Sequence, residues 1–236
     1  MTRPRPLRLF KLVVFSLTFL IIVIPAQASS GRTSGPHALD HTLTRLAPGA
    51  DPAVLHLAAM ALSCAAPEAS RLAVIDFSRP STEPRLWVFD LIAKRLLFKE
   101  LVSHGQGSGD ALARAFSNDP DSHQSSLGLF RTLDAYYGRN GYSLRLEGLE
   151  PGINDLAYQR AIVIHGAEYV SESFIGRTGR LGRSFGCPAV RPEISHRLID
   201  SLKDDQYLFA YYPDRKWLEH SSFLSCHKAD QQLASR

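Results

Sequence analysis

The chain has 236 residues, of which 44% are hydrophobic, 9% aromatic and 21% charged. This composition is that of an ordinary globular protein, and it excludes a disordered chain, a collagen and a disulfide-rich scaffold. Lys and Arg number 27 against 23 Asp and Glu. Because residues 1–28 hold four of the basic side chains and no acid, the remaining body is neutral. A neutral body without a basic stripe argues against nucleic acid as a partner.

Residues 1–28 have the three parts of an export signal. Four basic side chains lead into an apolar run from Leu12 to Ile24, and Ala26-Gln27-Ala28 supplies a small-x-small cleavage pattern. The run has 13 residues, whereas a membrane-spanning helix needs roughly 17–25. We therefore expect cleavage after Ala28, with an uncleaved anchor as the alternative. The mature protein would then work in the periplasm or another extracytoplasmic part of the cell envelope, and meet the membrane only through its signal peptide.

The rest of the chain is predicted to form one mainly β domain. Residues 29–50 are rich in Ser, Gly, Thr and Pro, and we expect a flexible leader there. Asp51-Pro52 supplies an N-cap and a first-turn proline, which predicts a helix from Ala53 to Ala65. Short β-like runs between turn-prone residues predict strands over 72–77, 85–90, 96–102, 128–132, 143–147, 161–164 and 206–212. Helices are expected near 111–116 and over 192–202, within a domain of residues 51–220 followed by a C-terminal tail of residues 221–236.

Two patterns rich in His or Gly are interpreted as non-catalytic. The segment from His104 to Gly109 has G-x-G-x-G spacing and lies among antiparallel strands, so it lacks the context of a dinucleotide loop. We interpret it as a flexible loop that borders a cleft, and we expect no nucleotide. His37 and His41 lie among Ser, Gly and Pro without an acidic third ligand. We predict no metal and no other cofactor.

A third pattern is typical of nucleophilic catalysis. A buried-strand run delivers His165-Gly166 at its end, and Gly186-Cys187-Pro188 follows, with the thiol 22 positions after the imidazole. An adjacent imidazole can hold a thiol as thiolate, and a His at a strand end is rigidly placed for a general base. Gly186 removes side-chain bulk, so that a substrate carbonyl could reach the amides of Gly186 and Cys187. The alternative is two unrelated core residues.

These residues resemble a known family. Ile164-His165-Gly166 followed by Ser184-Phe185-Gly186-Cys187 resembles the signature of the YkuD-like L,D-transpeptidases of the bacterial cell wall. The longer form Gly-Arg-Ser-Phe-Gly-Cys-Pro-Ala-Val, with Tyr169-Val170-Ser171 after the His, is similar to a divergent branch known as the murein L,D-transpeptidase catalytic domain. Ser125–Thr132 is similar to the Thr-Pro-x-Gly-x-Phe stretch that precedes the site in this family.

The resemblance implies a β-sandwich-like catalytic domain with a role for each motif residue. Cys187 matches the nucleophile, His165 the base, and Gly166 the residue whose carbonyl orients the imidazole. Phe185 stands where the main family has a second His, so no role of that His carries over. The candidates for substrate contact are Tyr169, Arg183, Ser184, Phe185 and His104.

The expected reaction is cleavage of a peptide bond in a peptidoglycan stem through a Cys187 thioester. Transfer to an amine would make a cross-link and transfer to water would make an L,D-carboxypeptidase, and the motif leaves the acceptor open. A catalytically silent wall-binding module is an alternative from another class, favoured by Phe185. A papain-like protease is disfavoured, because there the Cys precedes the His along the chain.

The three cysteines, Cys64, Cys187 and Cys226, leave at least one thiol outside any intramolecular disulfide. With Cys187 reserved for chemistry, we predict a disulfide between Cys64 and Cys226, because an oxidising compartment favours the pairing of spare thiols. The two ends of a domain also often lie close together. The alternative is that Cys64 is a small buried apolar residue.

Overall fold

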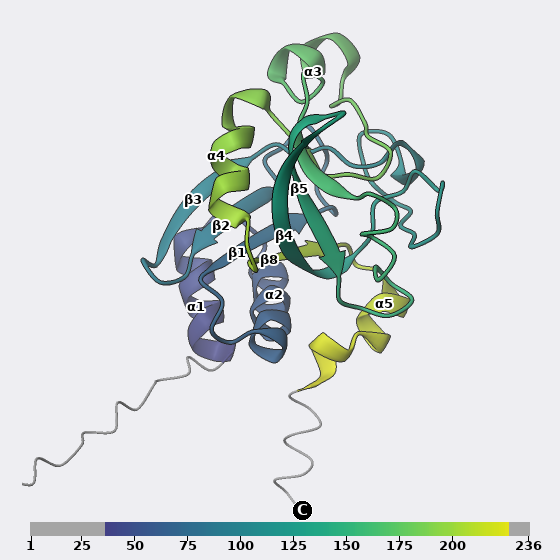
Figure 1. Ribbon diagram of the computed structural model, residues 1–236. Coiled ribbons are helices and arrows are strands. Elements are labelled where there is room, and N and C mark those ends of the chain that lie inside the picture. The colour runs from purple at the N-terminus through teal and green to yellow at the C-terminus, as the bar shows by residue number, and fades with distance from the viewer. Residues whose placement is uncertain (1–35, 227–236) are drawn as a thin grey trace, which may run out of the picture. The chain divides into compact units, whose positions relative to one another are not determined.

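An eight-stranded sheet organises residues 36–226, the part of the chain that this computed structural model describes (Figure 1). The strands are β1 (Arg71–Asp76), β2 (Leu86–Asp90), β3 (Arg95–Glu100), β4 (Gly128–Gly138), β5 (Gly141–Gly148), β6 (Val163–Gly166), β7 (Ala189–Val190) and β8 (Tyr207–Tyr211). Their order across the sheet is β3-β2-β1-β8-β4-β5-β6-β7. The pairs β1–β8 and β6–β7 are parallel, and the other neighbouring pairs are antiparallel.

The two edges of this sheet are joined by the segment that follows β3. The amide of Ser103 donates to Ala189 O on β7 at 2.9 Å, and the amide of Ser184 donates to His104 O at 3.1 Å. These bonds nearly close the sheet and bring the loop after β3 against the loop that carries Cys187. The mainly β catalytic fold predicted from the sequence is confirmed, and in place of a sandwich of two sheets it is one nearly closed sheet.

The helices surround the sheet. They are α1 (Pro36–Leu46), α2 (Pro52–Ala65), the short 3-10 helix η1 (Gln106–Ser108), α3 (Glu172–Thr178), α4 (Pro192–Leu202) and α5 (Arg215–His220). Helices α1 and α2 pack on one another and α2 lies against β1 and β8 (Figure 1). Helix α4 packs against β6. The predicted cap of α2 is confirmed, since Asp51 Oδ1 accepts the amide of Ala53 at 2.8 Å. No helix in this described range is long and apolar enough to cross a bilayer.

Several predicted boundaries are wrong. Residues 36–46 form helix α1 inside the segment expected to be a flexible leader, because Leu39, Leu43 and Leu46 share one face and pack on the core. Residues 111–116 are not helical; the one turn of helix in that loop lies earlier, at η1. Helix α3 and strand β7 were both missed, since each is too short to show a period. The export signal predicted over residues 1–28 lies outside the described residues.

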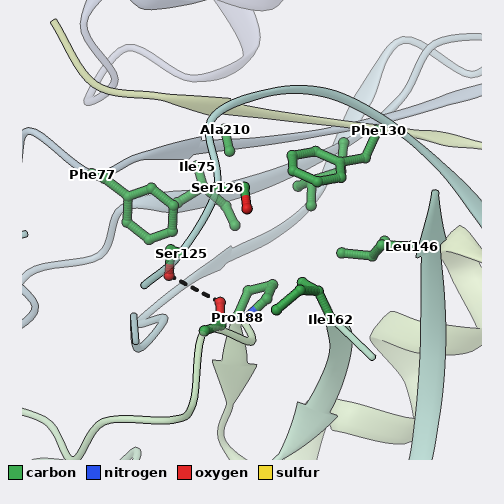
Figure 2. Close-up of a pocket in the computed structure, with 11 residues that line it drawn as sticks. Ile75, Phe77, Ser125, Ser126, Phe130, Leu146, Ile162, Pro188 and Ala210 are labelled. Atoms are coloured by element: carbon green, nitrogen blue, oxygen red, sulfur yellow. Dashed lines mark hydrogen bonds between the residues drawn. The ribbon is translucent and has the colours of Figure 1, made fainter. Parts of the chain in front are cut away.

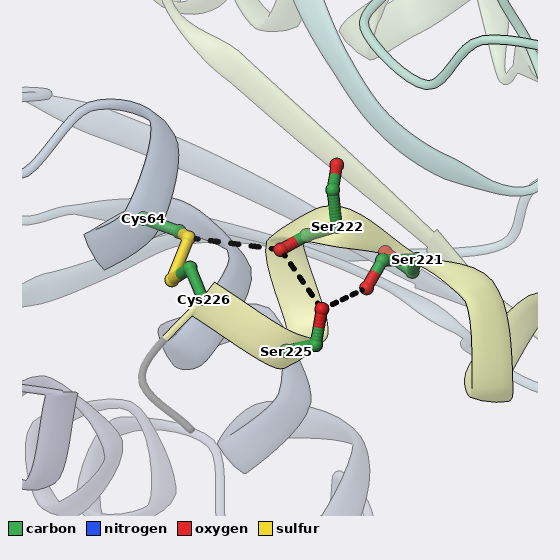
Figure 3. The surroundings of a disulfide bond; sticks show 5 residues. All are labelled: Cys64, Ser221, Ser222, Ser225 and Cys226. Atoms are coloured by element: carbon green, nitrogen blue, oxygen red, sulfur yellow. Dashed lines mark hydrogen bonds between the residues drawn. A yellow bond between two sulfur atoms is a disulfide. The ribbon is translucent and has the colours of Figure 1, made fainter. Parts of the chain in front are cut away.

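The chain beyond residue 220 is also part of the packed domain. Leu224 is buried against the hydrophobic core, although residues 221–236 were expected to form a tail. The predicted disulfide between Cys64 and Cys226 is confirmed, with a Cα–Cα distance of 6.3 Å (Figure 3). It joins the end of α2 to the last turn of chain that the structure describes. Cys187 remains a free thiol.

Candidate active site

One cavity of ≈ 400 Å³ brings the two motif segments together. His165 comes from β6, and its parallel pairing with Ala189 on β7 sets the loop before β7 beside it. Cys187, two residues before Ala189, therefore opens into the same cavity as His165. The other lining residues are Asn140, Gly166, Ala167, Glu168, Tyr169, Arg183, Ser184 and Phe185.

The Cys187 thiol is held by the backbone of the segment that leads into β6. Its exposed fraction is 8%. The Val163 amide donates to Sγ at 3.4 Å, and the thiol donates to Ala161 O at 3.6 Å. Ala161 has φ +54°, a left-handed conformation that a non-glycine residue adopts at some cost. Burial raises the pKa of Cys187, and the Val163 amide lowers it in part, so Cys187 is a neutral thiol at neutral pH.

His165 is oriented by its neighbour's carbonyl. Its Nδ1 lies 2.9 Å from Gly166 O. Because a carbonyl only accepts, Nδ1 carries the proton and Nε2 is left as the basic nitrogen. Burial lowers the pKa of His165, so the imidazole is also neutral at neutral pH. Gly166 has no room for a side chain, since a Cβ there would lie 2.8 Å from the Ser195 hydroxyl of α4.

Ser184 shapes the turn that presents the thiol. Its hydroxyl accepts the Gly186 amide at 3.1 Å and donates to Cys187 O at 2.6 Å. Gly186 has φ +119°, and a Cβ there would lie 2.8 Å from Gln124 O. Only glycine meets both the backbone angle and the close approach.

The turn rests on the hydrophobic core. The Ser125 hydroxyl donates to Gly186 O at 3.0 Å. Figure 2 draws this hydrogen bond as a dashed line from Ser125, near Pro188 and Ile162. The apolar cavity behind them is only ≈ 10 Å³, about the size of one water molecule. The thiol is therefore backed by packed side chains, and a substrate must approach from the larger cavity.

The expected oxyanion role of the Gly186 amide is wrong for this geometry, because that amide is already bonded to Ser184. The sequence motif does not show that the serine folds back on the glycine. Within the described residues the Cys187 amide donates to no backbone carbonyl, and it faces its own thiol. It is the amide of this turn that remains available to a developing oxyanion.

The expected substrate contact of His104 is also wrong. Its exposed fraction is 1%, and Arg85 Nη2 lies 2.7 Å from its Nδ1. Burial, together with the Arg85 charge, lowers the pKa of His104 to about 4, so the ring is a neutral acceptor for the guanidinium. His104 acts through its carbonyl, which accepts the Ser184 amide and supports the Cys187 turn from behind.

The other four candidates do line the cavity, and of these Ser184 uses its hydroxyl within the Cys187 turn. Phe185 is 68% exposed at its rim, and its ring lies 4.5 Å from that of His123. Arg183 is tethered to Asp110 at 2.9 Å. Burial and the proximity of Cys187 raise the pKa of Tyr169 to about 12, so its phenol stays protonated and is a hydrogen-bond donor.

Three supporting residues escaped the sequence interpretation. The Ser125 hydroxyl donates to Gly186 O, and the Ser195 hydroxyl lies against Gly166. Arg160 lies beside Gly186. Ser125 lies in the stretch that resembles the family, which was a usable signal; the other two stand in no recognisable pattern. Among residues 36–226 no group of three or more His, Cys, Asp or Glu side chains is arranged to hold a metal.

A family model for the L,D-transpeptidase catalytic domain matches residues 46–211, which is more than half of the chain. The chain belongs to this family. No curated protein was found to match.

Solved structures share only low identity with the chain. An L,D-transpeptidase from Mycobacterium smegmatis is 14% identical over 61% of this chain and 59% of its own, with a TM-score of 0.39. An L,D-transpeptidase from Stackebrandtia nassauensis is 12% identical over 75% and 78%, with a TM-score of 0.36. An L,D-transpeptidase from Xylanimonas cellulosilytica is 15% identical over 61% and 61%, with a TM-score of 0.35. The chain spans about three fifths of the first of these.

Proposed function

We propose that this protein is an exported L,D-transpeptidase that forms a thioester between Cys187 and a peptidoglycan stem peptide. The observation that carries the proposal is the shared cavity of Cys187 and His165, with Nδ1 of the imidazole bonded to Gly166 O and Nε2 left basic. A nucleophile beside a base, with the base oriented by a third group, is the arrangement that covalent catalysis requires.

Acylation starts from a neutral thiol and a neutral imidazole. As Cys187 Sγ attacks the stem carbonyl, Nε2 of His165 takes the thiol proton and the carbonyl oxygen becomes an oxyanion, which the Cys187 amide receives. The tetrahedral adduct then collapses, the C–N bond breaks, and Nε2 returns the proton to the leaving amine. The product is a Cys187 thioester and a free terminal amino acid.

Deacylation repeats these steps with a new nucleophile. An amine from a second stem peptide gives a cross-link, and water gives the L,D-carboxypeptidase product. In either case His165 removes a proton from the acceptor and returns it to Sγ as the C–S bond breaks. We propose the amine as the physiological acceptor on the family membership alone.

Export is supported by two separate features. Residues 1–28 have the charge, apolar run and cleavage pattern of a signal peptide. The Cys64–Cys226 disulfide is of a kind that persists in oxidising compartments such as the bacterial periplasm.

A silent wall-binding module is the second candidate, and the exposed Phe185 in the motif favours it. Incubating the mature protein with disaccharide-tetrapeptide muropeptides, followed by mass spectrometry of the products, separates these functions. Cross-linked dimers support the transpeptidase, and tripeptides alone support the carboxypeptidase. Unchanged substrate, equal to that left by the Cys187→Ala variant, would favour the silent module.

A further inference from the structure

Arg160 is a half-buried guanidinium held only by neutral groups. It donates to Gln124 O and Ser126 Oγ at 2.6 Å, to Ser117 O at 2.7 Å and to Ser122 Oγ at 3.2 Å. None of the ion pairs found among residues 36–226 includes Arg160. The Asp119 carboxylate acts on the guanidinium by charge but forms no salt bridge with it. A cation that is partly removed from water without a salt-bridge partner is costly.

The guanidinium lies directly beside the turn that carries the nucleophile. Arg160 Nη2 is 3.5 Å from the point where a Cβ on Gly186 would stand. The residues that follow Arg160 in the chain reach the thiol itself, through Ala161 O and the Val163 amide. One short segment thus supplies both the backbone contacts of Sγ and the nearby positive charge.

We propose that Arg160 is a positioning residue that stabilises the thiolate of Cys187 while the proton resides on His165. This rests on the proposed function, because it concerns the same nucleophile. In the step concerned the S–H proton moves to Nε2 of His165 and the electron pair stays on Sγ; Arg160 keeps all its protons. Its fixed charge favours the thiolate over the thiol, and hydrogen bonds to four acceptors keep that charge in place.

Arg160 and Cys187 each affect the pKa of the other. Burial raises the pKa of Cys187, and the Val163 amide and the charge of Arg160 lower it in part. Burial lowers the pKa of Arg160, and the charges of Cys187 and Asp119 raise it in part.

Besides Cys187, the titratable groups that line the cavity are His165, Tyr169, Glu168 and Arg183, and Arg160 lies outside this lining. Asp119 is the carboxylate whose charge acts on Arg160. His165 is neutral before the proton moves, and Arg183 is paired with Asp110. Of these two arginines near Cys187, Arg160 is therefore the one without a salt-bridge partner among residues 36–226.

A purely structural role is the competing explanation, since Arg160 also ties the loop of residues 117–126 to the start of β6. Two substitutions separate the roles. Arg160→Gln removes the charge but keeps an amide that can donate to Gln124 O, and Arg160→Lys keeps the charge but loses the forked geometry. Arg131→Met is the matched control, because it removes a guanidinium that is paired with Glu147 away from the cavity.

The readout is the rate of Cys187 alkylation by iodoacetamide as a function of pH, which needs no peptidoglycan substrate. The ultraviolet absorbance of the thiolate, taken as the difference from the Cys187→Ala protein, gives the thiol pKa independently. At a fixed pH below that pKa, Arg160→Gln should react about threefold to tenfold more slowly. Arg160→Lys and Arg131→Met should stay within about twofold of the native rate, an expectation taken from the same electrostatic argument.

An unchanged alkylation profile in Arg160→Gln would overturn the proposal, even if turnover fell. If the Gln variant does not fold, as judged by circular dichroism, Arg160→Lys decides alone: a native profile supports the proposal, and a slowed one contradicts it. If the native protein shows no turnover of muropeptides, the proposed function is refuted. If Cys187 is at the same time alkylated more slowly in Arg160→Gln than in the native protein, this inference stands.

Discussion

At the scale of single residues, the candidate site pairs a neutral thiol with a neutral imidazole, and this pairing sets the pH dependence expected of the proposed acylation. Burial lowers the pKa of His165, and only the neutral ring is a base. Acylation should therefore persist below the ordinary His pKa of about 6.5 and fall only at lower pH, as the ring gains its proton.

The measurement is the pH profile of the acylation rate with a chromogenic thioester or β-lactam probe. His165→Ala should lower the rate by about 10²–10⁴ at neutral pH, the usual contribution of a general base. An acid limb centred above 6.5 would contradict the neutral pair, since it would require an imidazole more basic than in water.

Ser184 illustrates how a motif residue can act through the backbone of the turn that it holds. Ser184→Ala removes both bonds of the turn, to the Gly186 amide and to Cys187 O. We expect the free energy of unfolding to fall by about 1–2 kcal/mol and turnover to fall by roughly tenfold, because Sγ is no longer held in place.

Ser184→Thr is the control, since it keeps the hydroxyl and should keep most of the activity. Steady-state turnover and chemical denaturation of the three proteins test the account. Full activity in Ser184→Ala would show that the turn is held by its other contacts.

At the scale of elements, the loop after β3 links the stability of the fold to the site. Its His104 is buried against Arg85, and burial together with the Arg85 charge lowers the pKa of His104 to about 4. The unfolded chain binds a proton at about pH 6.5, whereas the folded chain does so only near pH 4. Stability should therefore be fully present above pH 6.5 and be lost as the pH falls through this window, by up to about 3 kcal/mol.

Denaturant unfolding at several values between pH 7 and 4 measures this loss. His104→Gln keeps an acceptor for Arg85 but does not titrate, so its stability should depend less on pH than that of the native chain. Parallel curves for the two proteins would mean that other groups cause the acid destabilisation.

The elements also show where sequence reasoning succeeds. Alternating and continuous apolar runs predicted seven of the strands near their observed places, because each run buries side chains on at least one face of the sheet. The helix cap at Asp51 and the strand-end His165 were likewise local signals. Helix α1, strand β7 and α3 were not predictable in this way, since α1 gains its stability from α2 and β7 forms only by pairing with β6.

The residues of the candidate site also divide into those that a local motif predicts and those that depend on long-range contacts. Cys187, His165 and Gly166 could be assigned from the motif, whereas the contacts of Gly186 with Ser184, of His104 with Arg85 and of Arg160 with its four acceptors depend on segments far apart in sequence. Such long-range contacts leave no period and no spacing in the chain.

At the scale of the whole molecule, the Cys64–Cys226 disulfide closes a loop with a sequence separation of 162. Chain-entropy arguments assign such a loop about 5 kcal/mol, as an upper value. The Cys64→Ala/Cys226→Ala variant should melt at lower temperature but keep its turnover, because the bridge lies away from the cavity that holds Cys187.

Thermal unfolding and turnover of the double variant test this, with thiol counting of the native protein as the control. Native protein should show one thiol after denaturation without reductant. Three titratable thiols would contradict the bridge, and lost turnover in a folded double variant would contradict its separation from the site.

The central claim is that Cys187 carries the acyl group. Intact-protein mass spectrometry after rapid mixing with a stem tetrapeptide, followed by peptide mapping, tests it most directly. We expect a mass increase equal to the tripeptide acyl group, located on Cys187, lost on treatment with hydroxylamine and absent from Cys187→Ala. An adduct on another residue, or turnover that survives in Cys187→Ala, would contradict it.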